Sequence, residues 1–469
     1  MKIIKECLLI LLIVILVLVS IFFYMTRGQP KVTIDYTAEY NKISQPANYD
    51  PNQNAAELYQ AAYENLIQKP KQLQRGDAAY AEWPTDFNIV EDEIIKKWLT
   101  ENEKSLQIFR MASLKPYLWI EASSADGMIS IKYPEWTYLF YDLIEAVLWD
   151  AKTNAAKGEY ARAIEDISAC CRLSFQRCNN SPVFLMSMYN SLRQRQKAMY
   201  TAMLILKKSK ITESATISFQ QDIERITDTH SCVFDFSAEI MLLHDVVQRT
   251  YVYKPDESGL LAWKKKSDYY TLCDTGPWPI IKSCFVGPTQ KEVKKQINSY
   301  YDQLTAAYTL TPWQLHQEKP DFFDKLFLGC QPGTLVLYVY GSDFAGVYYD
   351  YYDTEAQYQA LLTTIAVLRF NRDKGRLPNN LDELVQTEYL KKLPVDPYSN
   401  KPLIYKVEAD DFKIYSVGKN FTDEGGEGSF YPSWIGTSGL PQDLVYWPPI
   451  DLMRVYQNRK RLYSEPNQP

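Results

Sequence analysis

Apolar residues recur at intervals of three and four along the first half of the chain, which is the spacing of one buried helix face. The pattern is clearest at residues 56–66, 91–114 and 137–154, and it continues to about Lys208. We therefore predict a mainly α fold in which these residues build a helical domain.

Residues 138–177 predict a helical hairpin within this domain. Gly158 can adopt the left-handed conformation that ends a helix, and apolar residues then recur on one face of the second helix. The segment GEYARAIEDISACCRL is similar to the second helix of a tetratricopeptide unit. A repeat array needs about three copies and only one is clear, so a helical-hairpin domain is the prediction and an array the alternative.

The helical pattern sharpens again after Thr354. A helix is expected to end near Asp373, with Gly375 placed to cap it. Asn380 can then cap a second, shorter helix, and Glu383 can complete a capping box by reaching back to it.

Two short strands follow these helices, at residues 403–407 and 412–417. Apolar and polar side chains alternate in the second strand, as they do in a half-buried strand, and the link at 408–411 is short enough for a hairpin. Residues 351–450 are therefore predicted to form a small α+β module with a short antiparallel sheet, followed by a tail at 451–469.

The N-terminal run from Cys7 to Met25 is uncharged and almost wholly apolar. As a helix with a rise of about 1.5 Å per residue, it is long enough to cross a hydrocarbon core of about 30 Å. A signal peptide is the alternative, but the run ends without a small-x-small cleavage site. Residues 1–27 are therefore predicted to be an uncleaved transmembrane anchor.

Charge does not decide the orientation of this anchor, because lysines precede the run and Arg27 and Lys31 follow it. Long domains cross membranes largely regardless of charge, so we expect an anchor in a bacterial inner membrane with the bulk of the chain on the periplasmic side. Residues 28–54 are polar and contain three prolines, which predicts a tether before a helical domain at 55–350.

The net charge of −6 gives nucleic acid no basic surface to bind. Tyrosine is unusually frequent among the 469 residues, with 36 copies, and ten tryptophans accompany it. These rings predict either packing between helices or an aromatic surface that binds a glycan or a peptide.

Cysteines and histidines form no catalytic or metal-binding pattern in the sequence. Cys273 and Cys284 flank a turn-rich segment and are the pair most suited to a disulfide, and no cysteine spacing fits a zinc site. His230 and His244 have polar neighbours one or two residues away, which point to other faces of a helix. We expect structural or surface roles for both, and for His316.

The segments RFNRDKGRLPNNLDELV, YLKKLPVDPYSNKPLIY and FKIYSVG follow one another in the C-terminal part of the chain. Together they resemble the globular part of the major pseudopilins of type II secretion systems, which have a helix, a Leu-Pro-x-Asp-Pro turn, a small antiparallel sheet and a glycine-rich calcium loop. The whole chain also resembles uncharacterised membrane-anchored bacterial proteins of the planctomycete kind that carry the same module.

The pseudopilin resemblance implies a calcium ion held by Asn420, Asp423, Glu424 and, after a longer excursion, Asp443. Hard oxygen ligands of this kind suit calcium. The sequence departs from the family where Asn420 replaces an aspartate and where residues 429–442 are inserted. An acidic, solvated loop that binds no metal is the alternative.

A filament role is not expected, because roughly 330 residues separate the apolar run from the module, far beyond the length of a loop within one unit. The sequence instead predicts a non-enzymatic, single-pass membrane protein that binds another protein at the cell envelope, and the resemblance implies a link to type II secretion-like machinery. The alternatives are an aromatic-rich glycan binder and a hydrolase with paired acids, such as Asp410 with Asp411 or Glu424 with Asp443.

Overall fold

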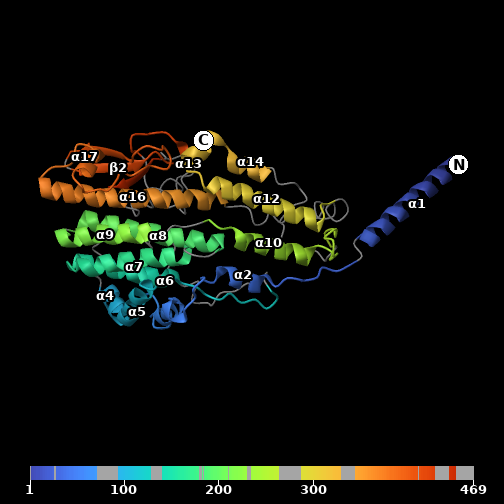
Figure 1. The fold of residues 1–469 in the computed structure, drawn as a ribbon, viewed down its shortest axis with the longest axis horizontal. Coiled ribbons are helices and arrows are strands. Elements are labelled where there is room, and N and C mark those ends of the chain that lie inside the picture. The colour runs from blue at the N-terminus through green and yellow to red at the C-terminus, as the bar shows by residue number, and fades with distance from the viewer. Residues whose placement is uncertain are drawn as a thin grey trace, which may run out of the picture.

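The computed structural model describes residues 2–25, 28–70, 93–127, 140–178, 182, 184–209, 211–229, 234–262, 287–328, 344–409, 411–427 and 443–449. Figure 1 shows an elongated body of helices stacked in layers, with helix α1 (Lys2–Met25) extending away from one end of it. A small sheet lies at the opposite end of the body. The prediction of a mainly α fold with a short antiparallel sheet is confirmed.

The first half of the body contains α2 (Tyr36–Ser44), η1 (Pro51–Gln53), α3 (Ala56–Glu64), α4 (Glu93–Glu101), α5 (Glu103–Ser113), α6 (Phe140–Ala156), α7 (Tyr160–Cys178) and α8 (Leu185–Lys208). The second half contains α9 (Glu213–Thr229), α10 (Ser237–Thr250), α12 (Gln290–Tyr308), α13 (Pro312–Glu318), α14 (Phe322–Leu328), α16 (Phe344–Lys374) and α17 (Leu381–Gln386).

The predicted hairpin is present as α6 and α7. Gly158 has a φ of +81°, and the amide of Glu159 donates to the carbonyl of Asn154 at 2.8 Å, so the chain reverses where a left-handed residue was expected. Helix α7 packs on α6, α8, α5 and α9. Every residue of α6 from Ala146 to Ala155 is buried. This helix is therefore an interior element, although its sequence carries several polar residues.

Residues 28–54 do not form the extended tether that the sequence predicted. They contain α2, whose N-terminus is capped by the Asp35 carboxylate, and Tyr36 and Tyr40 are buried with Ala122 and Ala238. The segment therefore packs on the body. Polar residues and prolines suggested a spacer, but long-range contacts bury the two rings that the segment carries.

The C-terminal module has the expected order of elements. Strands β1 (Ile404–Glu408) and β2 (Asp411–Ser416) pair antiparallel, and β3 (Leu444–Trp447), which the sequence did not predict, pairs with β2. Gly375 ends α16 with a φ of +69°. Asn380 caps α17, but the carboxylate of Glu383 accepts from the amide of Asn379 rather than from that of Asn380.

The module and the helical layers share one core rather than forming separate domains. Helix α16 runs unbroken across the predicted boundary between residues 350 and 351. Its Leu361 and Ile365, together with Phe412 of β2, belong to the same buried cluster as Leu143 of α6. We therefore treat the module as one end of the helical body.

A second buried cluster holds many of the aromatic rings. Tyr301, Tyr308 and Tyr348 are between 0% and 5% exposed, and their rings pack with Phe236 and Phe344. These tyrosines pack between helices α10, α12 and α16. Of the two roles expected for the aromatic residues, helix packing accounts for this group.

Helix α1 exposes its apolar side chains along most of its length. The large apolar side chains from Leu8 to Ile21 are between 42% and 61% exposed, whereas Phe22 is partly buried against the second cluster. Among the residues with described side chains, which in α1 run from Cys7 to Phe22, no helix is long and apolar enough to cross a membrane.

Candidate functional site

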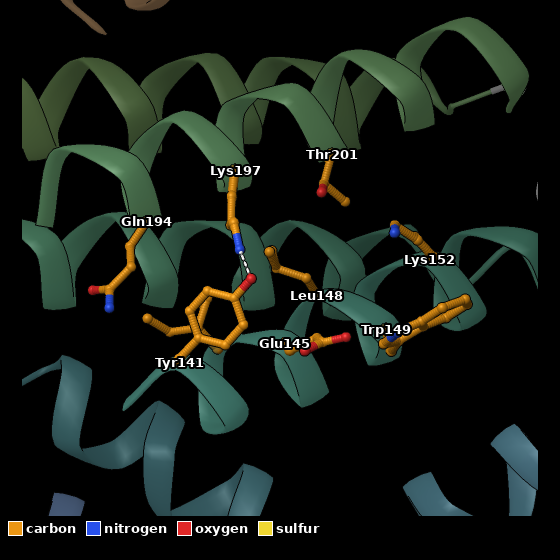
Figure 2. Close-up of a pocket in the computed structure, with 9 residues that line it drawn as sticks. Tyr141, Glu145, Leu148, Trp149, Lys152, Gln194, Lys197 and Thr201 are labelled. Atoms are coloured by element: carbon orange, nitrogen blue, oxygen red, sulfur yellow. Dashed lines mark hydrogen bonds between the residues drawn. The ribbon is translucent and has the colours of Figure 1, made fainter. Parts of the chain in front are cut away.

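A pocket lies between α6 and α8 in the helical layers (Figure 2). Its cavity volume is about 20 Å³, which is enough for one water-sized group. Side chains from both helices line it: Tyr141, Ile144, Glu145, Leu148, Trp149, Lys152, Gln194, Lys197 and Thr201. Polar and apolar groups therefore share one small space.

Lys152 is the unusual residue of this pocket. Its side chain is almost completely buried, with 4% exposed, and Nζ lies 4.7 Å from the centre of the Trp149 ring. Within the described part of the chain, no hydrogen bond or ion pair holds the Lys152 ammonium. Burial lowers the pKa of Lys152 to about 8, and the nearby Glu145 carboxylate opposes this effect.

The other charged groups of the pocket have partners. Glu145 forms an ion pair with Lys69 at 2.6 Å, and Lys197 donates a hydrogen bond to the Tyr141 hydroxyl, as Figure 2 shows. The Lys197 ammonium also lies 3.7 Å from the centre of the Tyr141 ring. These contacts fix the walls of the pocket around Lys152.

Thr201 adds a polar group on the α8 side of the pocket. Its side chain is fully buried, and Oγ1 has no hydrogen-bond partner. Thr153, Ser168 and Thr364 share this feature in the described residues, but Thr201 is the one of these hydroxyls that lines the pocket. No sequence motif marks this site, because its lysine and threonine lie on two helices that are separate in the chain.

A buried cluster of polar and charged side chains joins α5, α6 and α7. Arg110 Nε contacts Asp166 Oδ1 at 2.7 Å, and Arg110 Nη2 contacts Asp150 Oδ2 at 2.5 Å. Asn154 also donates to Asp150, at 3.0 Å. Burial raises the pKa of Asp166, and the Arg110 charge opposes that rise. The arrangement ties three helices together and faces no described pocket, so we assign it a structural role.

No family model, curated protein or solved structure matches the chain.

The acidic loop after β2 brings two of the four residues expected at the calcium site into direct contact. Asp443 is fully buried, and its Oδ2 accepts from the backbone amides of Glu424 and Gly426 at 3.0 and 2.7 Å. The Glu424 carboxylate in turn accepts from the Asp443 amide at 3.3 Å. Asp443 Oδ1 is buried without a hydrogen-bond partner and remains available as a ligand oxygen.

The other two expected ligands are held by local contacts. Asp423 Oδ1 accepts from the Tyr415 hydroxyl and the Gly425 amide, both at 2.9 Å, and Asn420 Oδ1 accepts from the Thr422 amide at 3.1 Å. No described contact joins Asn420 to Asp443. The hydrogen bond from Gly425 lowers the pKa of Asp423, whereas burial and the charges of Asp423 and Glu424 raise that of Asp443.

In the described residues, no group of three or more histidine, cysteine, aspartate or glutamate side chains is arranged to hold a metal ion. Calcium binding therefore stays a prediction, with Asp443 as its best-placed residue.

The histidines with described side chains have structural surroundings. His316 of α13 stacks on Phe421 with ring centres 4.2 Å apart, and burial lowers the pKa of His244. His230, the proposed Cys273–Cys284 disulfide and Asp410 lie outside the described residues.

Proposed function

We propose that the chain is a single-pass membrane protein whose helical body binds another protein at the bilayer surface. The anchor is α1. Its apolar sequence runs from Cys7 to Met25, and its large side chains are exposed along the helix, whereas the body buries most of its own. Exposing this much apolar surface to water costs about 25 cal/mol per Å², and a hydrocarbon core removes that cost.

The observation that carries the proposal is the direct attachment of the body to the end of α1. Phe22 packs on the second cluster, and the Tyr253 amide donates to the Gln29 carbonyl at 3.3 Å. Gly28 lies against Val252 so closely that an added Cβ would stand 2.6 Å from Val252 Cγ1. A body attached so close to the anchor lies at the membrane surface, which we place on the periplasmic side of a bacterial inner membrane.

A protein partner is favoured by exposed apolar side chains at the C-terminal end of α5, the helix on the outer side of the α6–α7 hairpin (Figure 1). Met111 is 58% and Leu114 is 66% exposed, and residues three apart at a helix end share a face. Exposed apolar residues mark an interaction site where they belong to a contiguous patch, and these two residues are the start of such a patch in our proposal. The pseudopilin resemblance of the C-terminal module makes type II secretion-like machinery the first class of partner to test.

The two alternative functions receive less support. Tyrosines of the aromatic cluster lie in the interior, where they cannot stack on a glycan. Of the paired acids suggested for a hydrolase, Glu424 and Asp443 bond to each other's backbone amides rather than facing each other across a described pocket.

Site-specific crosslinking in intact cells tests the protein-binding proposal. A photo-crosslinking amino acid replaces Leu114 in the full chain, and the matched control carries it at Gln303, an exposed polar position on α12. We expect a discrete protein adduct from position 114 and none from position 303. Equal labelling at both positions, or no adduct at either, would contradict a partner at this face.

A further inference from the structure

Lys152 and Thr201 face the same pocket from two helices, and neither polar end has a hydrogen-bond partner in the described residues. Buried charges in proteins are normally paired or bound to an ion. The face of the Trp149 ring, 4.7 Å from Nζ, offsets only part of the cost of burying an ammonium. Glu145, the carboxylate of the lining, is paired with Lys69, so within the described residues no carboxylate bonds directly to the Lys152 ammonium.

We propose that this pocket binds a monatomic anion of the size of chloride between the Lys152 ammonium and the Thr201 hydroxyl. Figure 2 shows Lys152 reaching from α6 and Thr201 from α8 toward the space between these helices. An ammonium and a hydroxyl are both hydrogen-bond donors, so together they suit an acceptor that carries negative charge.

The remaining charged groups around the pocket fit the same ligand. Glu145 is the acidic residue of the lining, and its carboxylate is engaged by Lys69. Lys197 and Tyr141 bond to each other at one end of the pocket and bring a further positive charge. The lining therefore carries more positive than negative charge when its lysines are protonated.

The size and polarity of the pocket limit the ligand. The walls of the pocket are apolar and are formed by Leu148, Ile144 and the Trp149 ring. An ion with a large hydration shell would therefore lose its water there without gaining new polar contacts. Chloride loses its water more readily than a phosphate dianion does. Binding should also weaken as the pH rises through the pKa of Lys152 at about 8, because the neutral amine no longer attracts an anion.

Thermal unfolding of the full chain tests the site, with chloride as the probe and gluconate at the same ionic strength as the reference anion. We expect chloride to raise the Tm of the wild type by an amount that grows with the logarithm of its concentration. Lys152→Met and Thr201→Val should lose this rise, Thr201→Ser should keep it, and Lys325→Met, which alters an exposed lysine of α14, should match the wild type.

Because each variant is compared with itself in the two salts, a change in its own stability does not obscure the result. A chloride-dependent rise that Lys152→Met retains would overturn the proposal, since the anion would then act elsewhere. Equal Tm values of the wild type in chloride and gluconate would overturn it as well, and would assign the pocket to a neutral amine with bound water.

Discussion

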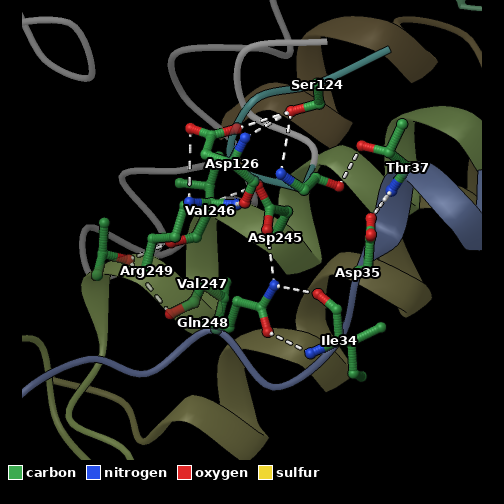
Figure 3. Close-up of polar contacts among 12 residues, drawn as sticks. Ile34, Asp35, Thr37, Ser124, Asp126, Asp245, Val246, Val247, Gln248 and Arg249 are labelled. Carbon is green, nitrogen blue, oxygen red and sulfur yellow. Dashed lines mark hydrogen bonds and ion pairs between the residues drawn. The ribbon is translucent and has the colours of Figure 1, made fainter. Parts of the chain in front are cut away.

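The side-chain amide of Gln248 hydrogen-bonds both polar backbone atoms of Ile34. Gln248 Nε2 donates to the Ile34 carbonyl at 2.9 Å, and Oε1 accepts from the Ile34 amide at 3.2 Å (Figure 3). Nε2 also donates to Asp245 at 2.6 Å, and the same Asp245 carboxylate pairs with Arg249 at 2.7 Å. One residue of α10 thus satisfies the backbone of a segment more than two hundred positions away and holds it to the body.

Gln248→Ala should release the segment between α1 and α2. The change removes the partners of the partly buried Ile34 backbone groups, and a hydrogen bond of this kind contributes about 0.5–1.5 kcal/mol. Hydrogen exchange measured by mass spectrometry should become faster in peptides that cover residues 30–44. Gln303→Ala is the control, because that amide is exposed and bonds only within α12. Unchanged exchange at residues 30–44 would show that Gln248 does not hold the segment.

Arg110→Met should strongly destabilise the body. The arginine is 7% exposed, and its loss leaves the buried Asp150 and Asp166 carboxylates without their main counter-charge. Breaking a buried ion pair in this way costs about 3–5 kcal/mol, measurable by urea unfolding. Lys97→Met removes an exposed ion pair with Glu101 and should have a much smaller effect. Similar losses for the two variants would refute a structural role for the buried network.

Stability should rise with pH because of Lys152. Its pKa is about 8 in the folded chain against a usual value of 10.5, so between these pH values the unfolded chain binds a proton that the folded chain does not. The free energy of unfolding therefore increases across this window, by up to about 3 kcal/mol, since each pKa unit corresponds to about 1.4 kcal/mol.

The variant Lys152→Met isolates this contribution, because all other titrating groups remain. The free energy of unfolding is measured with denaturant at pH 7 and pH 10. We expect it to rise less with pH in the variant than in the wild type, or to fall more. Identical pH dependences would mean that Lys152 keeps a normal pKa in the folded chain.

Calcium should raise the Tm of the chain if the acidic loop binds it. Asp443→Asn should abolish the rise, because this buried carboxylate offers an oxygen with no other partner. Asp382→Asn, at an exposed position of α17, is the control. Burial and neighbouring carboxylates raise the pKa of Asp443, so protons compete with the metal and calcium binding should strengthen as the pH increases. No calcium effect on the wild type would favour the solvated loop.

Local signals in the sequence were sufficient for elements whose ends are set by single residues. Gly158 and Gly375 end helices with a positive φ, and Asn380 caps α17, each as the sequence predicted. The sequence also predicts strands β1 and β2, because the alternation of side chains in β2 and the short link between the strands are local properties.

Features that depend on long-range contacts could not be predicted in this way. The sequence of residues 28–54 predicts a tether because nothing within the segment indicates that Tyr36 and Tyr40 are buried. Their burial depends on contacts with Ala122 and Ala238, far along the chain. Strand β3 has only four residues, so its pairing with β2 defines it rather than a pattern in the sequence. Lys152 resembled an ordinary solvated lysine, and its burial follows from the packing of α6 among other helices.

Membrane association of the full chain tests the central claim, that α1 anchors the body at the bilayer, most directly. Membranes from expressing cells are washed with alkaline carbonate, and the full chain is compared with a variant that lacks residues 2–25. We predict that the full chain stays in the membrane pellet and that the shortened variant is released. Release of the full chain by the wash would contradict the account.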